Sequence, residues 1–205
     1  MADGRACCPL ADHIAAIVDR PRADFRREDM LHVIETRHIQ CITFHYTALD
    51  GRLKELRMPV TDRGQAEAIL AEGERVDGSS LFRGLVDTAQ SDLYVVPVYR
   101  SAFLNPFDNG SLDFVCRFLT REGEPAPFAP DAVLSKAERL FEAHTGLQIR
   151  ALGELEFFLL GGDFSRRYAA EPQRGYHESA PFLKGGEVLN EMARSLARIT
   201  GAVKY

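Results

Sequence analysis

The strongest constraint on the fold is a pair of β-rich segments joined by a tight turn. Ile39 to Tyr46 is rich in β-branched and aromatic residues, Leu53 to Val60 is the expected return strand, and Asp50-Gly51 lies between them. Asp-Gly between two such runs is typical of a β-hairpin, because glycine adopts the positive φ that the turn needs. The pattern therefore predicts an antiparallel hairpin over residues 39–60.

The segment after this hairpin predicts a helix from about Asp62 to Glu72. Thr61 is expected to cap its first turn, and Gly73 is expected to end it. Its inward-facing residues should be Ala66, Ile69 and Leu70. A hairpin that is followed by a helix and then by more strands predicts an α+β unit.

The remaining periodicities divide the chain into three parts. Further helices are expected at Leu10 to Val18, Arg27 to Arg37, Asp131 to His144 and Gly186 to Thr200; further strands are expected at Leu93 to Val98, Leu112 to Phe118 and Gln148 to Leu160. We expect a helical extension over residues 1–36, the α+β unit over 37–122 and a second unit over 123–205. Gly123 to Pro130 contains three prolines and is interpreted as the linker.

Composition excludes several classes of function. The 205 residues carry a net charge of −5, whereas a nucleic-acid-binding domain usually has a basic face. No apolar run approaches the roughly 20 residues that span a bilayer, and no secretion signal is evident. The four cysteines are Cys7, Cys8, Cys41 and Cys116; they show no Cys-x-x-Cys spacing and are expected to be reduced. Cys41 and Cys116 are expected in strands of the core. These features favour a cytoplasmic protein without nucleic-acid or membrane partners.

Two alternating glutamates form the first candidate site. In the segment Glu154-Leu155-Glu156-Phe157, read as a strand, Glu154 and Glu156 share one face about 7 Å apart. Two carboxylates so placed repel each other unless cations lie between them, and Mg²⁺ and Mn²⁺ prefer oxygen ligands. A pair of divalent ions would fit. The alternative is an amphipathic strand with two solvated glutamates.

A second candidate site is the turn-rich segment from Glu74 to Gly84. It contains Asp77-Gly78-Ser79-Ser80, and Asp and Ser side chains bond locally to the backbone in turns. The motif alone is most simply a turn. Three later motifs strengthen it: Ser91-Asp92 before a strand, then Asn105-Pro106-Phe107, then the Glu-x-Glu segment.

This ordered series resembles the N-terminal part of glutamine synthetase, from about Arg37 to the end of the chain. That family has an Asp-Gly-Ser-Ser loop, a Ser-Asp strand, a Pro-Phe turn and a Glu-Pro-Glu metal strand in the same order. Leu155 departs from the family, which often has proline there, and the N-terminal extension has no clear counterpart. The resemblance implies a β-grasp domain followed by the incomplete opening of the catalytic α/β domain.

The family's chemistry supplies the functional expectation. The resemblance implies an ATP-dependent glutamate–ammonia ligase, or a relative that ligates glutamate to another amine. Two Mg²⁺ or Mn²⁺ ions would act with ATP, and the site would be shared between subunits of a homo-oligomeric ring. Because most ATP- and glutamate-binding residues are not found in this chain, we expect it to be inactive alone. The alternative is a non-catalytic, glutamine-synthetase-like regulatory or assembly protein.

The resemblance also implies roles for individual residues. Asp77 would help bind ammonium and accept its proton, with Ser80 supporting the loop. Tyr176 would line the same ammonium pocket. Glu154 would hold the metal nearer the nucleotide phosphates, and Glu156 the metal nearer glutamate. The six histidines show no metal-binding spacing, and no glycine-rich phosphate loop occurs.

Overall fold

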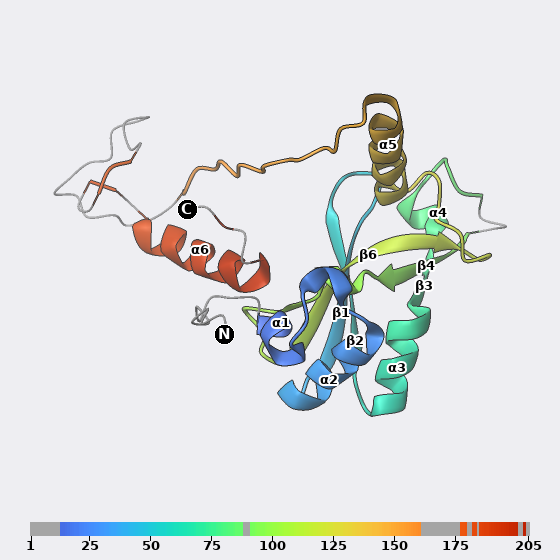
Figure 1. Cartoon of the computed structure of the whole chain (residues 1–205), viewed down its shortest axis with the longest axis horizontal. Coiled ribbons are helices and arrows are strands. Elements are labelled where there is room, and N and C mark those ends of the chain that lie inside the picture. The colour runs from blue at the N-terminus through green and yellow to red at the C-terminus, as the bar shows by residue number, and fades with distance from the viewer. Residues whose placement is uncertain are drawn as a thin grey trace.

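The computed structural model describes residues 13–87, 91–160, 177–179, 182–183, 185–200 and 203. A mixed six-stranded sheet lies at its centre (Figure 1). The strands are β1 (Cys41–Thr47), β2 (Leu53–Pro59), β3 (Glu74–Asp77), β4 (Asp92–Pro97), β5 (Phe103–Leu104) and β6 (Ser111–Thr120). The helices are α1 (His13–Val18), α2 (Arg27–Arg37), α3 (Arg63–Glu72), α4 (Gly78–Leu81), α5 (Pro130–Thr145) and α6 (Gly186–Thr200).

The sheet is assembled around its last long strand. The order is β2-β1-β6-β4-β3, with β5 added beside β6. The hairpins β1–β2 and β3–β4 are antiparallel, whereas β6 runs parallel to β1 and antiparallel to β4. Strand β6 therefore joins the two hairpins into one sheet.

One face of the sheet forms the hydrophobic core with α2 and α3. Phe44 of β1 and Phe114 and Phe118 of β6 are buried on this face. Phe82, which follows α4, meets Phe118 edge to face with ring centroids 5.0 Å apart. The expected inward residues of α2 and α3 are buried: Met30, Leu31, Val33, Ile34, Ala66, Ile69 and Leu70. The α+β fold class is thus confirmed.

The opposite face of the sheet carries a buried polar cluster. The Asp113 carboxylate is completely buried and accepts hydrogen bonds from His45 Nε2 at 2.7 Å and Asn105 Nδ2 at 2.9 Å. The Ser111 hydroxyl donates to its other oxygen, and Ser111 also bonds to the Thr43 hydroxyl at 2.9 Å. A buried carboxylate is tolerated only when it is paired in this way.

The N-terminal cap of α3 differs from the sequence expectation. The N-cap is Asp62, not Thr61: Asp62 Oδ1 accepts from the Gln65 amide at 2.9 Å. Thr61 instead bonds through its hydroxyl to the Gln65 side chain at 2.7 Å. Gly73 ends the helix as expected, with φ of 72°. A Cβ there would lie 2.3 Å from the Val95 carbonyl oxygen, so only glycine fits.

The proline-rich segment 123–130, interpreted from the sequence as a linker, packs partly on the sheet. Pro125 forms a bridge with Leu119, and the Ala126 amide donates to the Phe118 carbonyl at 3.0 Å. Ala126 and Ala129 are fully buried. Helix α5 begins directly afterwards, with proline in its first turn and Gly146 at its end.

The expected strand over residues 148–160 does not form. This segment is extended and exposed, and none of the described residues pairs with it. A strand needs a hydrogen-bonded neighbour, so alternation alone cannot produce one. The apolar faces of α5 and α6 are also largely exposed, including Val133, Leu140, Val188, Leu189 and Leu196.

The N-terminal segment contacts both the sheet and α6. Arg22 donates through Nη1 to the Ala102 carbonyl at 2.8 Å and through Nη2 to the Ile199 carbonyl at 3.1 Å. Phe25 lies under its guanidinium, 5.9 Å from the ring centroid. Within the described residues, no helix is long and apolar enough to cross a membrane.

Candidate functional site

The Asp77 segment folds as a strand end followed by one helical turn. Residues 74–77 form the edge strand β3, although the sequence predicted only a loop here. Asp77 then caps α4, because its carboxylate accepts from the Ser79 amide at 3.0 Å. The exposed Asp77 carboxylate therefore lies at the end of the edge strand.

Both oxygens of the Asp77 carboxylate are held by neighbouring serines. Ser80 Oγ donates to Oδ2 at 2.5 Å, and Ser79 Oγ donates to Oδ1 at 2.7 Å. These hydroxyl groups, Ser80 first, lower the pKa of the Asp77 carboxyl to about 2, because they stabilise its charged form. Asp77 is therefore a carboxylate at neutral pH.

Gly78 fixes the turn against the next strand. Its amide donates to the Ser91 carbonyl at 2.7 Å. A Cβ at this position would lie 2.7 Å from Leu93 Cδ1 and 2.9 Å from the Ser91 oxygen, closer than real Cβ atoms approach. The Ser91 side chain also bonds to Asp77 and contributes to its lowered pKa. Glycine is thus required here for close packing.

A second charged pair lies beside Asp77 on the same strands. Asp92 of β4 is the register partner of Asp77, and Arg75 of β3 approaches the Asp92 carboxylate at 3.4 Å. Arg75 therefore offsets the Asp92 charge and reduces repulsion between the two aspartates. Ser79 and Asp92 belong to motifs that the sequence analysis quoted, but neither was given an individual role, and Arg75 was not singled out. The pairing of Arg75 with Asp92 depends on the register of β3 with β4.

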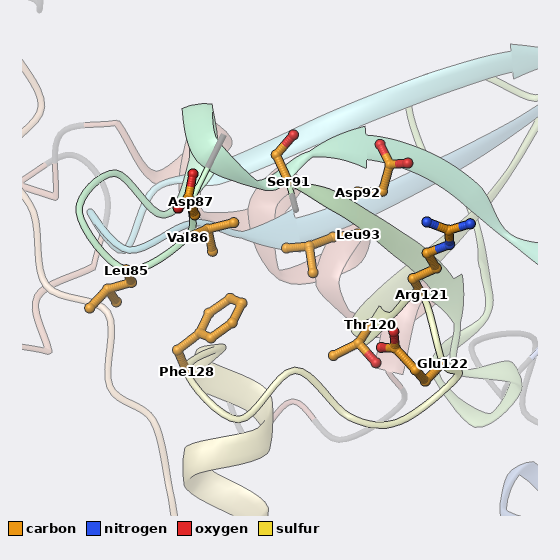
Figure 2. Close-up of a pocket in the computed structure, with 10 residues that line it drawn as sticks. All are labelled: Leu85, Val86, Asp87, Ser91, Asp92, Leu93, Thr120, Arg121, Glu122 and Phe128. Atoms are coloured by element: carbon orange, nitrogen blue, oxygen red, sulfur yellow. The ribbon is translucent and has the colours of Figure 1, made fainter. Parts of the chain in front are cut away.

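A cavity of about 480 Å³ adjoins this turn. Figure 2 shows Val86, Leu93 and Phe128 around its middle, with polar side chains both where β6 ends and along the opposite side. Its lining residues are Leu85, Val86, Asp87, Ser91, Asp92, Leu93, Thr120, Arg121, Glu122 and Phe128. Ser91 thus contacts both the Asp77 turn and the cavity.

Two of the other predicted site residues, Glu154 and Glu156, are not brought to Asp77. Glu154 and Glu156 lie in the exposed segment after α5. Tyr176 lies outside the described residues. Among the residues that are described, no group of three or more His, Cys, Asp or Glu side chains could hold a metal ion.

Comparison with known proteins finds a similarity to one family. The family model for the glutamine synthetase β-grasp domain matches residues 38–121. This part of the chain is therefore similar to the β-grasp domain of glutamine synthetases. The chain is recognised as glutamine synthetase-like on this match and on its curated relatives.

Those relatives align with most of the chain. A glutamine synthetase from Methanococcus maripaludis is 23% identical over 179 residues, which cover 84% of this chain and 40% of that protein. One from Thermotoga maritima is 28% identical over 181 residues, covering 84% and 39%. The chain thus spans about 40% of the length of the relatives it matches.

A solved structure agrees at the level of the fold. The structure titled apo GmaS without ligand superposes with a TM-score of 0.50 and 16% identity, over 56% of this chain and 26% of that one. At this identity the similarity supports the α+β architecture and nothing finer.

Proposed function

We propose that this chain supplies the N-terminal part of an ATP-dependent glutamate–ammonia ligase, or of a relative that ligates glutamate to another amine. The main support is the Asp77 turn. Its exposed carboxylate is held in one conformation by Ser79 and Ser80, and the Gly78 contact fixes the turn. A fixed negative charge of this kind suits the binding of a small cation such as ammonium.

In this proposal Asp77 acts first by charge. With a pKa of about 2 it stays ionised, so it can hold ammonium at neutral pH but is a weak proton acceptor while both serines donate to it. Release of the Ser80 hydrogen bond would increase its basicity. Ser80 would therefore regulate the step from cation binding to proton acceptance.

Glu154 and Glu156 are the proposed ligands of two Mg²⁺ or Mn²⁺ ions. Carboxylate oxygens suit these ions, but two carboxylates on an exposed segment are an incomplete donor set. Further ligands must come from outside the described residues. Bound there, such ions would neutralise negative charge on a phosphoryl group. Glu154 and Glu156 would each orient one ion.

The partners follow from the same proposal. Glutamate, ammonia and ATP would be the substrates, with Tyr176 near the ammonium, and the site would be completed between subunits of a homo-oligomer. The exposed apolar faces of α5 and α6 support a larger assembly, since such faces rarely remain uncovered. The second candidate function is a non-catalytic, glutamine-synthetase-like regulatory or assembly protein.

Two measurements test the proposal. Mn²⁺ should broaden the NMR signals of residues 153–157 with roughly millimolar affinity, given the small number of ligands, and Glu154→Ala with Glu156→Ala should abolish the effect. Undiminished broadening in the double variant would contradict the metal assignment.

The second measurement concerns activity. The 205-residue chain alone should form no glutamine from glutamate, ammonia and ATP. A reading frame that continues past codon 205 into further Glu and His motifs, and whose product loses activity on Asp77→Asn, would support the ligase. An inactive product that still binds a glutamine synthetase would support the second candidate.

A further inference from the structure

The cavity beside the Asp77 turn has an apolar wall that is packed against the hydrophobic core. Leu93 is almost fully buried beneath it, and Val86 and Phe128 are partly buried. Phe128 packs against Phe82 with ring centroids 5.1 Å apart, so its ring is anchored to the core. In Figure 2 these apolar side chains surround the middle of the cavity. The volume of about 480 Å³ is within the range of small-molecule sites.

The lining of the cavity is more acidic than basic. Three of its lining residues are acidic, Asp87, Asp92 and Glu122, against one basic residue, Arg121. Arg75 offsets the charge of Asp92, which leaves Asp87 and Glu122 against Arg121. The Thr120 hydroxyl donates to Glu122 and lowers the pKa of its carboxyl, which therefore remains ionised. A ligand that combines a positive charge with an apolar body complements both features. The aromatic face of Phe128 also attracts a cation.

Ser91 connects this cavity to the Asp77 turn. It lines the cavity, its carbonyl accepts from the Gly78 amide at 2.7 Å, and its side chain bonds to Asp77. A ligand in the cavity therefore contacts a residue that holds the turn in place.

We propose that this cavity is a binding site for a small organic ammonium ion with an apolar body, and that its occupancy is transmitted to the Asp77 turn through Ser91. The proposal rests on the apolar wall of the cavity, its lining charges and the contacts of Ser91, and it does not depend on ligase activity. The site is separate from the Asp77 carboxylate, because Asp77 is not among the residues that line it.

The test is an NMR titration of the 205-residue chain with phenethylammonium chloride. Saturable shifts are expected at the amides of Leu93, Ser91 and Gly78, with roughly millimolar affinity for a ligand of this size. Two probes accompany it: 3-phenylpropionate has a similar body and the opposite charge, and ammonium chloride has the charge without the body. Neither should produce these shifts, and equal shifts from either would overturn the proposal.

Matched variants locate the site. Glu122→Gln should weaken phenethylammonium binding about two- to fivefold, the usual size of an exposed charge contact. Glu124→Gln, an exposed glutamate that does not line the cavity, should leave binding unchanged. Phe128→Ala should weaken binding further. If Phe128→Ala proves unstable, the comparison of Glu122→Gln with Glu124→Gln still tests the proposal. Equal affinities for the Glu122 and Glu124 variants would place the ligand elsewhere.

Discussion

Arg22 and Ile199 are joined by a hydrogen bond although 177 positions separate them. Nη2 of Arg22 donates to the Ile199 carbonyl near the end of α6, while Nη1 of the same side chain donates to the carbonyls of Arg100 and Ala102. One guanidinium thus links the N-terminal segment, the sheet and the last helix. The planar fork of arginine suits this role, because lysine has a single charged nitrogen.

Replacing Arg22 should loosen α6. Arg22→Ala removes charged hydrogen bonds worth about 1–3 kcal/mol, so amide hydrogen exchange in residues 190–199 should accelerate at least about fivefold. Arg52→Ala, which removes an exposed side chain near Asp50, is the control and should leave α6 unchanged. Identical exchange in both variants would show that Arg22 does not hold the helix.

The charge state of Asp77 should depend on Ser80. Ser80→Ala removes the largest cause of the lowered pKa, so the carbon-13 titration midpoint of the Asp77 carboxyl should rise from about 2 toward its ordinary value. Ser135→Ala, on the exposed surface of α5, should not move it. A midpoint unaffected by Ser80→Ala would contradict the role of Ser80 in lowering the pKa of Asp77.

This lowered pKa has a defined effect on stability. The folded carboxyl has a lower pKa than the unfolded one, so its contribution is present above pH of about 4 and is lost as pH falls toward 2. Stability curves of the wild-type chain and Ser80→Ala should therefore converge over that range. Curves that stay parallel from neutral pH to pH 2 would contradict the linkage.

Gly78 should not tolerate a side chain. Gly78→Ala would force Leu93 or the Ser91 backbone to move, which should cost about 1–3 kcal/mol in the free energy of unfolding. Gly153→Ala is the matched control, because nothing lies within 4 Å of the added Cβ. Urea unfolding measures both. Equal stability of the two variants would show that the turn shifts without cost.

The buried Asp113 should be essential for stability. Asp113→Ala leaves buried donors of His45, Asn105 and Ser111 without their acceptor, which should cost about 2–5 kcal/mol. Asp113→Asn keeps one acceptor oxygen and should cost less. Glu55→Ala, an exposed carboxylate on β2, should change stability by less than about 0.5 kcal/mol. If Asp113→Ala unfolds at the same urea concentration as the wild-type chain, the hydrogen bonds to Asp113 do not contribute to stability as expected.

The α+β domain could be predicted from sequence wherever the pattern was local. Asp50-Gly51 specified the β1–β2 hairpin, and the apolar spacing specified α2 and α3, because these features depend on neighbouring residues. The edge strand β3 was missed, since Glu74-Arg75-Val76-Asp77 has charged residues that usually indicate a loop. Its pairing with β4 supplies the backbone hydrogen bonds that its composition does not suggest.

The candidate site was predictable only in part. Asp77 and Ser80 were identified through a motif, and the structure shows a hydrogen bond between them. Their roles in binding ammonium stay a prediction. The roles of Ser91 and Arg75 depend on the register of β3 with β4, which no local pattern gives. The strand expected at Glu154 and Glu156 does not form, because a strand also depends on a pairing partner. The alternating pattern is present there, but none of the described residues pairs with the segment.

The central position of β6 has a consequence for how the chain acquires its structure. Its partner β1 precedes it by about 70 positions in their register, Cys41 opposite Ser111, so the two hairpins remain separate until β6 has been synthesised. Pairing over such separations is slow and exposes unpaired strand edges meanwhile. On the ribosome, the nascent chain should therefore resist proteolysis only after Thr120 has left the exit tunnel, and shorter nascent chains should depend on chaperones.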